Sequence, residues 1–361
     1  MSSRKVCEYT RLLDFLRKIE VAKPIPLNTW KPHFTPVNAS VSIILRLYIR
    51  DHTKRPKRLR TIEKQRIHGD PTQPLQLTPD EVDKYFQSQD HFDKANCEAQ
   101  VFYIKRGDDE GDRFSGHVAF PGGKVEEGES LLEGAIRETH EEVGFDLLDS
   151  NNFALITQYP LTIPFMFMKN RRRMFVTPFV FLQLSFDEIQ PAYQEREVQS
   201  SVWTSLEFLA SHNEQFFWYR PQRNPRYKTD LTLLMPTFLL VDSEEYSQQD
   251  IYNDPSVVNK DFPLGGMTLY LTRHFLNFTG MKNIRPHMGY YKIQEIKNKT
   301  LSVIAGKFFS LFAINPQYYF QEAWKEYQYY VYLSSVGLAT AYGGFKWFKS
   351  KNGEKLRSSK I

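Results

Sequence analysis

The sequence is poor in cysteine, because Cys7 and Cys97 are the only two among 361 residues. Two cysteines without a spacing pattern are too few for a disulfide framework or a structural zinc site, and they indicate a reducing, intracellular compartment. The first residues also lack the apolar core of a secretory signal, since charges are scattered through residues 1–23.

No charge of one sign dominates the chain. The 47 basic and 42 acidic residues leave a net charge of +5, and 41% of the residues are hydrophobic. This composition excludes overall disorder and is typical of a globular protein with one large domain plus extensions, or two smaller domains. The mild positive charge is compatible with phosphorylated substrates and with anionic surfaces, and requires neither.

Long apolar runs are scarce, and the exception is Tyr329–Phe348, which carries one charge, Lys346. Its length suits a bilayer span, and aromatic residues stand at both ends. Two interpretations remain, a membrane helix and a helix packed on the main domain, and we slightly favour the first. The final Ser359–Ile361 resembles a weak peroxisomal address. Membrane anchoring, the organelle (peroxisome, mitochondrion or endoplasmic reticulum) and the oligomeric state are left open.

The most informative stretch runs from Gly116 to Phe145. A short apolar run ends at Pro121, and Gly122 and Gly123 then permit backbone angles that other residues avoid. Apolar residues at spacings of three and four predict a helix over 132–143, which ends at Gly144 in a left-handed cap.

The same helix carries three glutamates, Glu138, Glu141 and Glu142. Residues three and four apart share one side of a helix, and like charges at that spacing repel. A cation between the carboxylates would explain the arrangement, since Mg²⁺ prefers oxygen ligands and keeps water and substrate phosphates in its shell. A solvated acidic helix face is the alternative.

These residues resemble the box of the Nudix hydrolases, G-x5-E-x7-R-E-U-x-E-E-x-G-U, in which U is apolar. All seven fixed positions match, and one U position differs, because residue 139 is threonine. A threonine hydroxyl can bond back to the preceding turn, so this change is tolerable. The matched positions are Gly123, Glu129, Arg137, Glu138, Glu141, Glu142 and Gly144.

The resemblance implies an α/β/α sandwich with a mixed, curved sheet, and a metal-dependent enzyme that hydrolyses a diphosphate bond in a nucleotide derivative. It implies that Glu138 and Glu142 hold Mg²⁺ or Mn²⁺, and that Glu141 is a further ligand or the general base. Arg137 would orient the carboxylates, and Glu129 would support Arg137. Such a metal neutralises diphosphate charge and activates a bound water.

A narrower similarity is to the coenzyme A diphosphatases. Arg106, Arg113, Gly116 and the F-P-G-G of 120–123 resemble their upstream signature, although Gly107 replaces a serine and the gap to Arg113 is longer. Residues 263–275 resemble their closing helix, with Gly265 at the usual tryptophan. Coenzyme A or acyl-CoA is therefore the leading substrate.

The likeness also implies substrate-binding residues. Arg106 and Arg113 would contact substrate phosphates beside Gly122 and Gly123, unless the two arginines are solvated turn charges. Glu197 begins a segment similar to one that follows the third strand in such hydrolases, and is an outer metal ligand or base, or else a helix cap or surface charge.

Three regions are predicted: an N-terminal helix and linker (1–37), the hydrolase domain (38–280), and a basic, helical C-terminal extension (281–361). Strands 39–50 and 99–105 should form a hairpin around an insertion at 51–97, with a short helix at 78–86. Further strands are predicted at 154–157, 175–184 and 231–241.

The insertion opens with a basic run over 54–66. It is a solvated loop or an anion-binding segment; the lack of interleaved aromatic residues argues against nucleic acid. The alternatives to coenzyme A are ADP-ribose, NADH, dinucleoside polyphosphates, RNA 5′ ends, and a non-catalytic nucleotide-binding module.

Overall fold

A computed structural model describes residues 7–22, 37–56, 70, 72–108, 115–167, 172–212, 217–222, 233–243, 245, 262–278 and 292–293. Arg113, most of the basic run, and the segments 329–348 and 359–361 lie outside the described residues, so the predictions on them stay predictions. Within the described ranges, no helix has both the length and the apolar character needed to cross a membrane.

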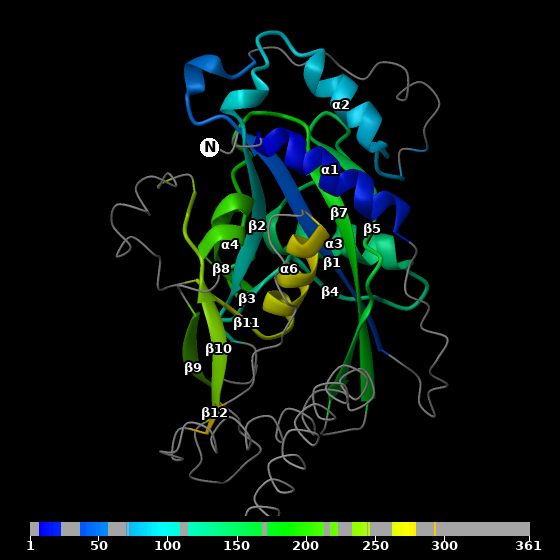
Figure 1. Ribbon diagram of the computed structural model, residues 1–361. Helices are drawn as coiled ribbons and strands as arrows, with labels where there is room; N and C mark the ends of the chain where they lie inside the picture. Colours follow the sequence, from blue (N-terminus) through cyan, green and yellow to red (C-terminus); the bar gives the residue numbers. More distant parts are fainter. Residues whose placement is uncertain are drawn as a thin grey trace, which may run out of the picture. The chain divides into compact units, whose positions relative to one another are not determined.

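The described helices and strands alternate along the chain in the manner of a mixed α/β domain (Figure 1). They are α1 (Glu8–Val21), β1 (Val37–Tyr48), η2 (His52–Lys54), α2 (Pro79–Gln87), η3 (Lys94–Asn96), β2 (Glu98–Arg106), β3 (Val118–Ala119), β4 (Gly122–Lys124), α3 (Leu131–Val143), β5 (Phe153–Gln158), β6 (Ile163–Phe167), β7 (Arg172–Gln183), β8 (Val198–Ser205), α4 (Leu206–His212), β9 (Phe217–Gln222), β10 (Leu233–Leu239), β11 (Pro263–Gly265), α6 (Gly266–Phe278) and β12 (Lys292–Ile293).

The central sheet has eight strands, with β3, β2, β1, β7 and β5 in order and β4, β6 and β8 paired to β1, β7 and β2. The predicted pairing of the first two long strands is confirmed, since β1 and β2 run antiparallel with Leu45 opposite Val101. β1 and β7 run parallel from Val37 opposite Met174 to Arg46 opposite Gln183. One parallel pair among antiparallel ones makes the sheet mixed, as the resemblance implies.

Helices cover both faces of this sheet. On one face Thr139 of α3 bonds to Ser42 of β1, and on the other Tyr103 of β2 bonds to Thr272 of α6. Because successive side chains of a strand point to opposite faces, Phe102 and Ile104 pack on the α3 side while Tyr103 packs under α6. α1 shares the α6 side, where Phe15 contacts Phe275 with ring centroids 4.4 Å apart. The predicted sandwich is therefore confirmed.

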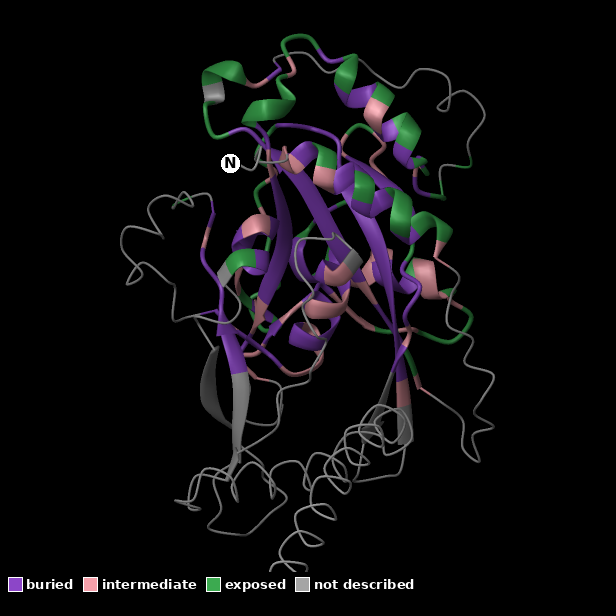
Figure 2. Cartoon of the chain, viewed as in Figure 1, coloured by how far each residue is buried: buried purple, intermediate pink, exposed green. Residues whose placement is uncertain are grey.

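The core between α3 and the sheet is aromatic. Phe102 lies 5.0 Å from Phe145 and 4.8 Å from Trp203 between ring centroids, and Phe145 lies 5.7 Å from Phe153. All four residues are buried, as the purple strands and the inner side of the helices show in Figure 2. Burying each side chain stabilises the fold by about 1.5–3 kcal/mol, so this core fixes α3 on the sheet.

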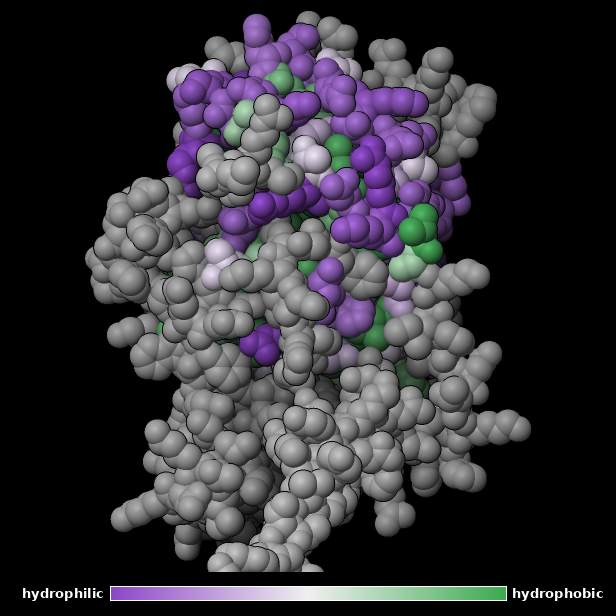
Figure 3. All heavy atoms as spheres, in the orientation of Figure 1, coloured by the Kyte–Doolittle hydropathy of each residue, from purple (hydrophilic) through white to green (hydrophobic). Residues whose placement is uncertain are grey.

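The N-terminal helix α1 packs against the insertion helix α2, and α1 lies on the same face of the sheet as α6. Tyr9 of α1 donates a hydrogen bond to Asp83 of α2 at 2.7 Å, and Arg17 pairs with Asp80 at 3.0 Å. The predicted start of α2 is confirmed, because Thr78 and Glu81 form a capping box. Figure 3 shows mainly hydrophilic residues over α1 and α2, so this layer presents a polar outer surface.

The region after β8 holds a separate, four-stranded sheet in the order β11, β10, β12, with β9 paired to β10. The strand predicted over 231–241 is β10, with bounds Leu233–Leu239. The predicted closing segment is β11 followed by α6, which begins at Gly266 and buries Leu269, Leu271 and Phe275.

Candidate active site

The site is built around α3, whose ends are fixed by its own sequence. Ser130 accepts a hydrogen bond from the Glu133 N–H, and the Glu133 side chain accepts one from the Ser130 N–H, which makes a capping box. The predicted left-handed stop is confirmed at Gly144, with φ of 72°. These caps determine which turn of the helix carries the glutamates.

Two adjacent glycines let the chain pass close to that turn, for different reasons. Gly122 has φ of 141°, and a Cβ there would lie 2.3 Å from the Ser40 carbonyl oxygen. Gly123 has no such backbone angle; a Cβ on it would lie 2.5 Å from the Glu138 carboxylate. The expectation of unusual backbone angles holds for Gly122 and is wrong for Gly123, which is needed for space.

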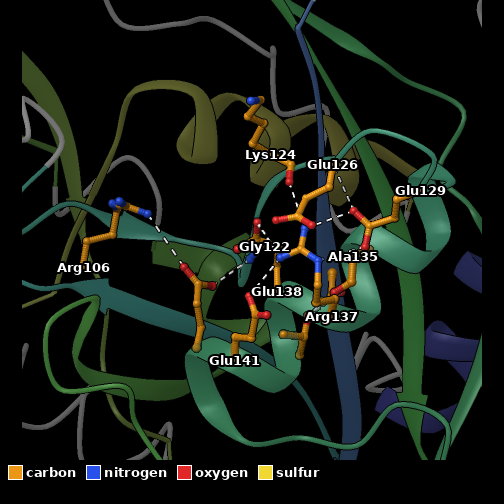
Figure 4. Close-up of polar contacts among 12 residues, drawn as sticks. Arg106, Gly122, Lys124, Glu126, Glu129, Ala135, Arg137, Glu138 and Glu141 are labelled. Carbon is orange, nitrogen blue, oxygen red and sulfur yellow. Dashed lines mark hydrogen bonds and ion pairs between the residues drawn. The ribbon is translucent and has the colours of Figure 1, made fainter.

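Arg137 lies between two sets of carboxylates (Figure 4). Its Nε and Nη2 donate to the two oxygens of Glu129 at 2.9 and 3.0 Å, and Nη2 also donates to the Lys124 carbonyl at 3.0 Å. Its Nη1 lies 3.2 Å from Glu138 and 2.9 Å from Glu141. This fork raises the pKa of Arg137 and lowers that of Glu129, because each stabilises the charged form of the other. These contacts are the ones that the predicted orienting role of Arg137 requires.

Glu142 is the most buried of the three helix carboxylates, with 2% of its side chain exposed. Its Oε2 accepts a hydrogen bond from the Gly122 N–H at 2.8 Å, and its Oε1 lies 3.8 Å from Arg106 Nη1. Burial raises the pKa of Glu142 to about 8, against the opposing influence of the Gly122 N–H and Arg106, while Glu138 and Glu197 raise it further.

Glu138 shows the same conflict more weakly. Burial raises its pKa, Arg137 lowers it, and the charges of Glu141 and Glu197 raise it again. Glu141 is the open member of the group, with 49% of its side chain exposed. The carboxylates therefore form a graded series from the core to the solvent.

This donor set fits a hard divalent cation. Glu138, Glu141 and Glu142 bring carboxylates to the site; burial raises the pKa of Glu138 and of Glu142, and the charge of Glu138 raises that of Glu142 further. Carboxylate oxygens are the ligands that Mg²⁺ and Mn²⁺ prefer, and such a cation would offset this repulsion. Among the described residues, no three His, Cys, Asp or Glu side chains are arranged closely enough to hold a metal ion. Arg137 instead takes up Glu138 and Glu141.

Two candidates from outside the box approach the same carboxylates. Arg106, at the end of β2, is the partner of Glu142 in the described conformation, whereas the sequence predicts a substrate contact. Glu197 lies where its charge acts on both Glu138 and Glu142. Its carbonyl accepts the Gly107 N–H at 2.7 Å, and a Cβ at Gly107 would lie 2.4 Å from the Arg196 carbonyl oxygen. Gly107 thus lets the Glu197 segment close on β2.

The one apolar position of the box that holds a polar residue is accommodated as expected. Thr139 Oγ1 lies 2.7 Å from the Ala135 carbonyl, one turn earlier, and 2.8 Å from Ser42 Oγ. Thr139 is fully buried, so its hydroxyl needs these partners. Ser42 was not recognised from the sequence, although its place in a strand next to the box helix was a possible signal.

The segment 192–197 is the last part of the connection from β7 to β8; the sequence singled out Glu197 in it, but not its contact with α3. Its Ala192 N–H donates to the Val143 carbonyl at 2.9 Å, and its Gln194 N–H donates to the Glu142 carbonyl at 3.2 Å. These bonds hold the segment against the C-terminal end of α3. The sequence signal for this contact was weak, namely the acidic and aromatic content of Y-Q-E-R-E at 193–197.

The comparisons with known proteins agree with the site. Residues 89–223 match the family model described as the NUDIX domain. No curated protein matches the chain. The matched range begins after β1, so β1, a central strand of the sheet, lies outside the match.

Several solved structures are similar to about half of the chain. A MutT protein from Methanosarcina mazei Go1 is 14% identical over 50% of this chain and 83% of its own, with a TM-score of 0.28. An Ap4A hydrolase from C. elegans is 14% identical over 47% and 81%, with a TM-score of 0.27. The E. coli dihydroneopterin triphosphate pyrophosphohydrolase is 15% identical over 48% and 84%, with a TM-score of 0.27. These scores are too low to carry an argument, so the assignment depends on the family model and the site.

Residues 89–223 thus match a NUDIX domain, and all seven residues of the box lie intact within this range. The chain is accordingly a pyrophosphohydrolase, an enzyme that cuts a diphosphate bond in a nucleotide derivative.

Proposed function

We propose that this enzyme hydrolyses the diphosphate of coenzyme A or an acyl-CoA in a reaction that requires Mg²⁺ or Mn²⁺. The observation that supports the reaction is the convergence of Glu138, Glu141 and Glu142 beside Gly122 and Gly123. Arg137 pairs with Glu138 and Glu141, and the Gly122 N–H donates to Glu142. The coenzyme A substrate has weaker support, from the partial signature around Arg106 and the segment 263–275.

Glu138 and Glu142 would hold the cation, with Glu141 or Glu197 as a further ligand. When bound, the cation neutralises diphosphate charge and makes a bound water a stronger nucleophile. Glu141 is the most exposed of the three glutamates and pairs with Arg137, so water can reach its carboxylate, which would accept a proton from the attacking water. Arg137 keeps the carboxylates in position through Glu129, and Arg106 lies close enough to the cluster to contact a substrate phosphate.

A substrate panel tests this proposal. Purified protein would be incubated with coenzyme A, ADP-ribose, NADH, dinucleoside polyphosphates and 5′-capped RNA, with Mg²⁺ or Mn²⁺, and the products identified by mass. Cleavage of coenzyme A to two phosphate-bearing products at the highest kcat/KM supports it. A higher kcat/KM for another compound of the panel would refute coenzyme A as the substrate and support diphosphate hydrolysis. Inactivity on every compound would refute both the substrate and the reaction.

Isosteric variants connect the activity to the site. Glu141→Gln and Glu142→Gln should each lower turnover by about 100-fold or more while the fold persists, because each removes one charge without changing side-chain volume. Glu127→Gln is the matched control, since Glu127 is exposed and lies outside the cluster. Unchanged turnover in both site variants would show that the reaction occurs elsewhere.

A further inference from the structure

One exposed aromatic side chain stands beside the site and has no place in the reaction described above. Among the described residues, only Val21 and Tyr193 are large hydrophobic side chains that remain exposed, and Tyr193 is 38% exposed. Val21 ends α1, whereas Tyr193 belongs to the 192–197 segment that closes on the catalytic helix.

The backbone on both sides of Tyr193 is fixed to α3. The N–H groups of Ala192 and Gln194 donate to the carbonyls of Val143 and Glu142, the last two residues of that helix. Tyr193 is therefore next in sequence to Gln194, whose N–H bonds to the carbonyl of Glu142, a proposed metal ligand. The segment is thereby attached to the turn of α3 that carries Glu142.

The ring of Tyr193 is also anchored at its far end. Its hydroxyl lies 2.8 Å from Ser201 Oγ on β8, and Ser201 pairs with Ile104 on β2. In the same ladder Arg106 pairs with Val198, and Ile104 and Val198 both belong to the core beneath α3. The hydroxyl of Tyr193 thus contacts β8 on the α3 side of the sheet. β8 pairs with β2, and Arg106 is the last residue of β2.

We infer that Tyr193 is a specificity-determining residue that stacks against a flat ring of the substrate, such as a nucleobase. This inference rests on the proposed function, because it places the diphosphate at Glu138 and Glu142. An aromatic ring held at both ends has little conformational entropy left to lose on binding. Stacking of a base on such a ring contributes about 1–3 kcal/mol and does not discriminate strongly between bases.

Binding of non-hydrolysable probes tests the inference without requiring turnover. Calorimetry with Mg²⁺ would compare α,β-methylene-ADP with methylenediphosphonate, which carries the same linkage but no base. For Tyr193→Leu, which keeps an apolar side chain but no ring, we expect the affinity for α,β-methylene-ADP to fall about tenfold. The affinity for methylenediphosphonate should not change, and Tyr193→Phe should stay within about threefold of wild type for both probes.

The outcomes separate this inference from the proposed function. Equal affinities of wild type and Tyr193→Leu for α,β-methylene-ADP, or no binding of that probe by wild type, would overturn the stacking role. An equal loss for both probes would show a structural role for Tyr193 and would overturn it as well. If base-dependent binding is seen but the substrate panel shows no cleavage, the stacking role stands and the hydrolase proposal fails.

Discussion

Replacing Gly123 with alanine should inactivate the enzyme while leaving its fold intact. The added Cβ would lie 2.5 Å from Cδ and Oε2 of Glu138 and 2.6 Å from Oε1, where ordinary contacts begin at 3.4 Å. The Glu138 carboxylate must therefore move by about 1 Å to restore normal contact. Misplacement of a catalytic group by that distance can lower the rate by about 100-fold.

The folded state should tolerate this change because the atoms in the way belong to the end of a flexible side chain. The backbone of Gly123 is outside the left-handed region, so alanine is not strained there and can even stabilise the chain by about 0.4–1 kcal/mol through the unfolded state. We expect kcat/KM to fall about 100-fold, with a melting temperature within a few degrees of wild type.

Two neighbouring glycines provide matched controls. Gly128→Ala meets no atom within 4 Å but places alanine at φ of 87°, so it should cost about 1 kcal/mol of stability and leave kcat/KM unchanged. Gly122→Ala combines φ of 141° with a contact of 2.3 Å to backbone, so the protein should not accumulate in folded form. Full activity of folded Gly123→Ala would refute the claim that catalysis needs Glu138 in its present position.

Three other residues give further predictions. Arg137→Lys replaces a fork with a point charge, so kcat should fall about 10- to 100-fold in steady-state kinetics; an unchanged kcat would contradict the orienting role. Thr139→Val should change the free energy of unfolding by less than about 1 kcal/mol and leave kcat unchanged, because Ser42 Oγ keeps the Ala135 carbonyl as an acceptor at 3.3 Å; a larger loss in urea titration would show that the hydroxyl is required. His274 bonds to the Tyr159 hydroxyl at 2.8 Å, and burial lowers its pKa below 6.5, so stability is complete above pH 6.5 and falls as the pH drops below it, by up to about 1.4 kcal/mol per pH unit. His274→Gln should remove this part of the acid loss, and an equal slope in both proteins would contradict it.

The local features of the site could be predicted from the sequence. The helix over Leu131–Val143, its stop at Gly144 and the shared side of Glu138 and Glu141 follow from spacing and from single-residue preferences. The pairing of β1 with β2 followed from alternation and β-branched content. These features depend on neighbours in the chain, which a pattern can report.

The long-range features could not be predicted. Spacing placed Glu142 with the other two glutamates, but it gave no indication that Glu142 is buried or that Arg106 is its partner. Both depend on the approach of β2 to α3, through contacts between residues far apart in the chain. The parallel pairing of β1 with β7 has no local signal either, because it joins segments separated by the whole box.

Glycine shows the same division. A doubled glycine suggests unusual backbone angles, and this is correct for Gly122. Gly123 is needed because Glu138 fills the space where a side chain would lie, and this contact can be seen only once α3 and β4 are placed together. The sequence singled out Glu197 but not the bonds of the 192–197 segment to Val143 and Glu142, because they join it to a distant part of the sequence.

The central claim is that the carboxylates of α3 hold a divalent cation, and binding of Mn²⁺ tests it most directly. Electron paramagnetic resonance measures free Mn²⁺ during a titration of wild type, Glu142→Gln and the exposed control Glu127→Gln. We predict that wild type and Glu127→Gln bind Mn²⁺ with the same affinity and that Glu142→Gln binds it at least about tenfold more weakly. Equal Mn²⁺ affinity in all three proteins would contradict the claim.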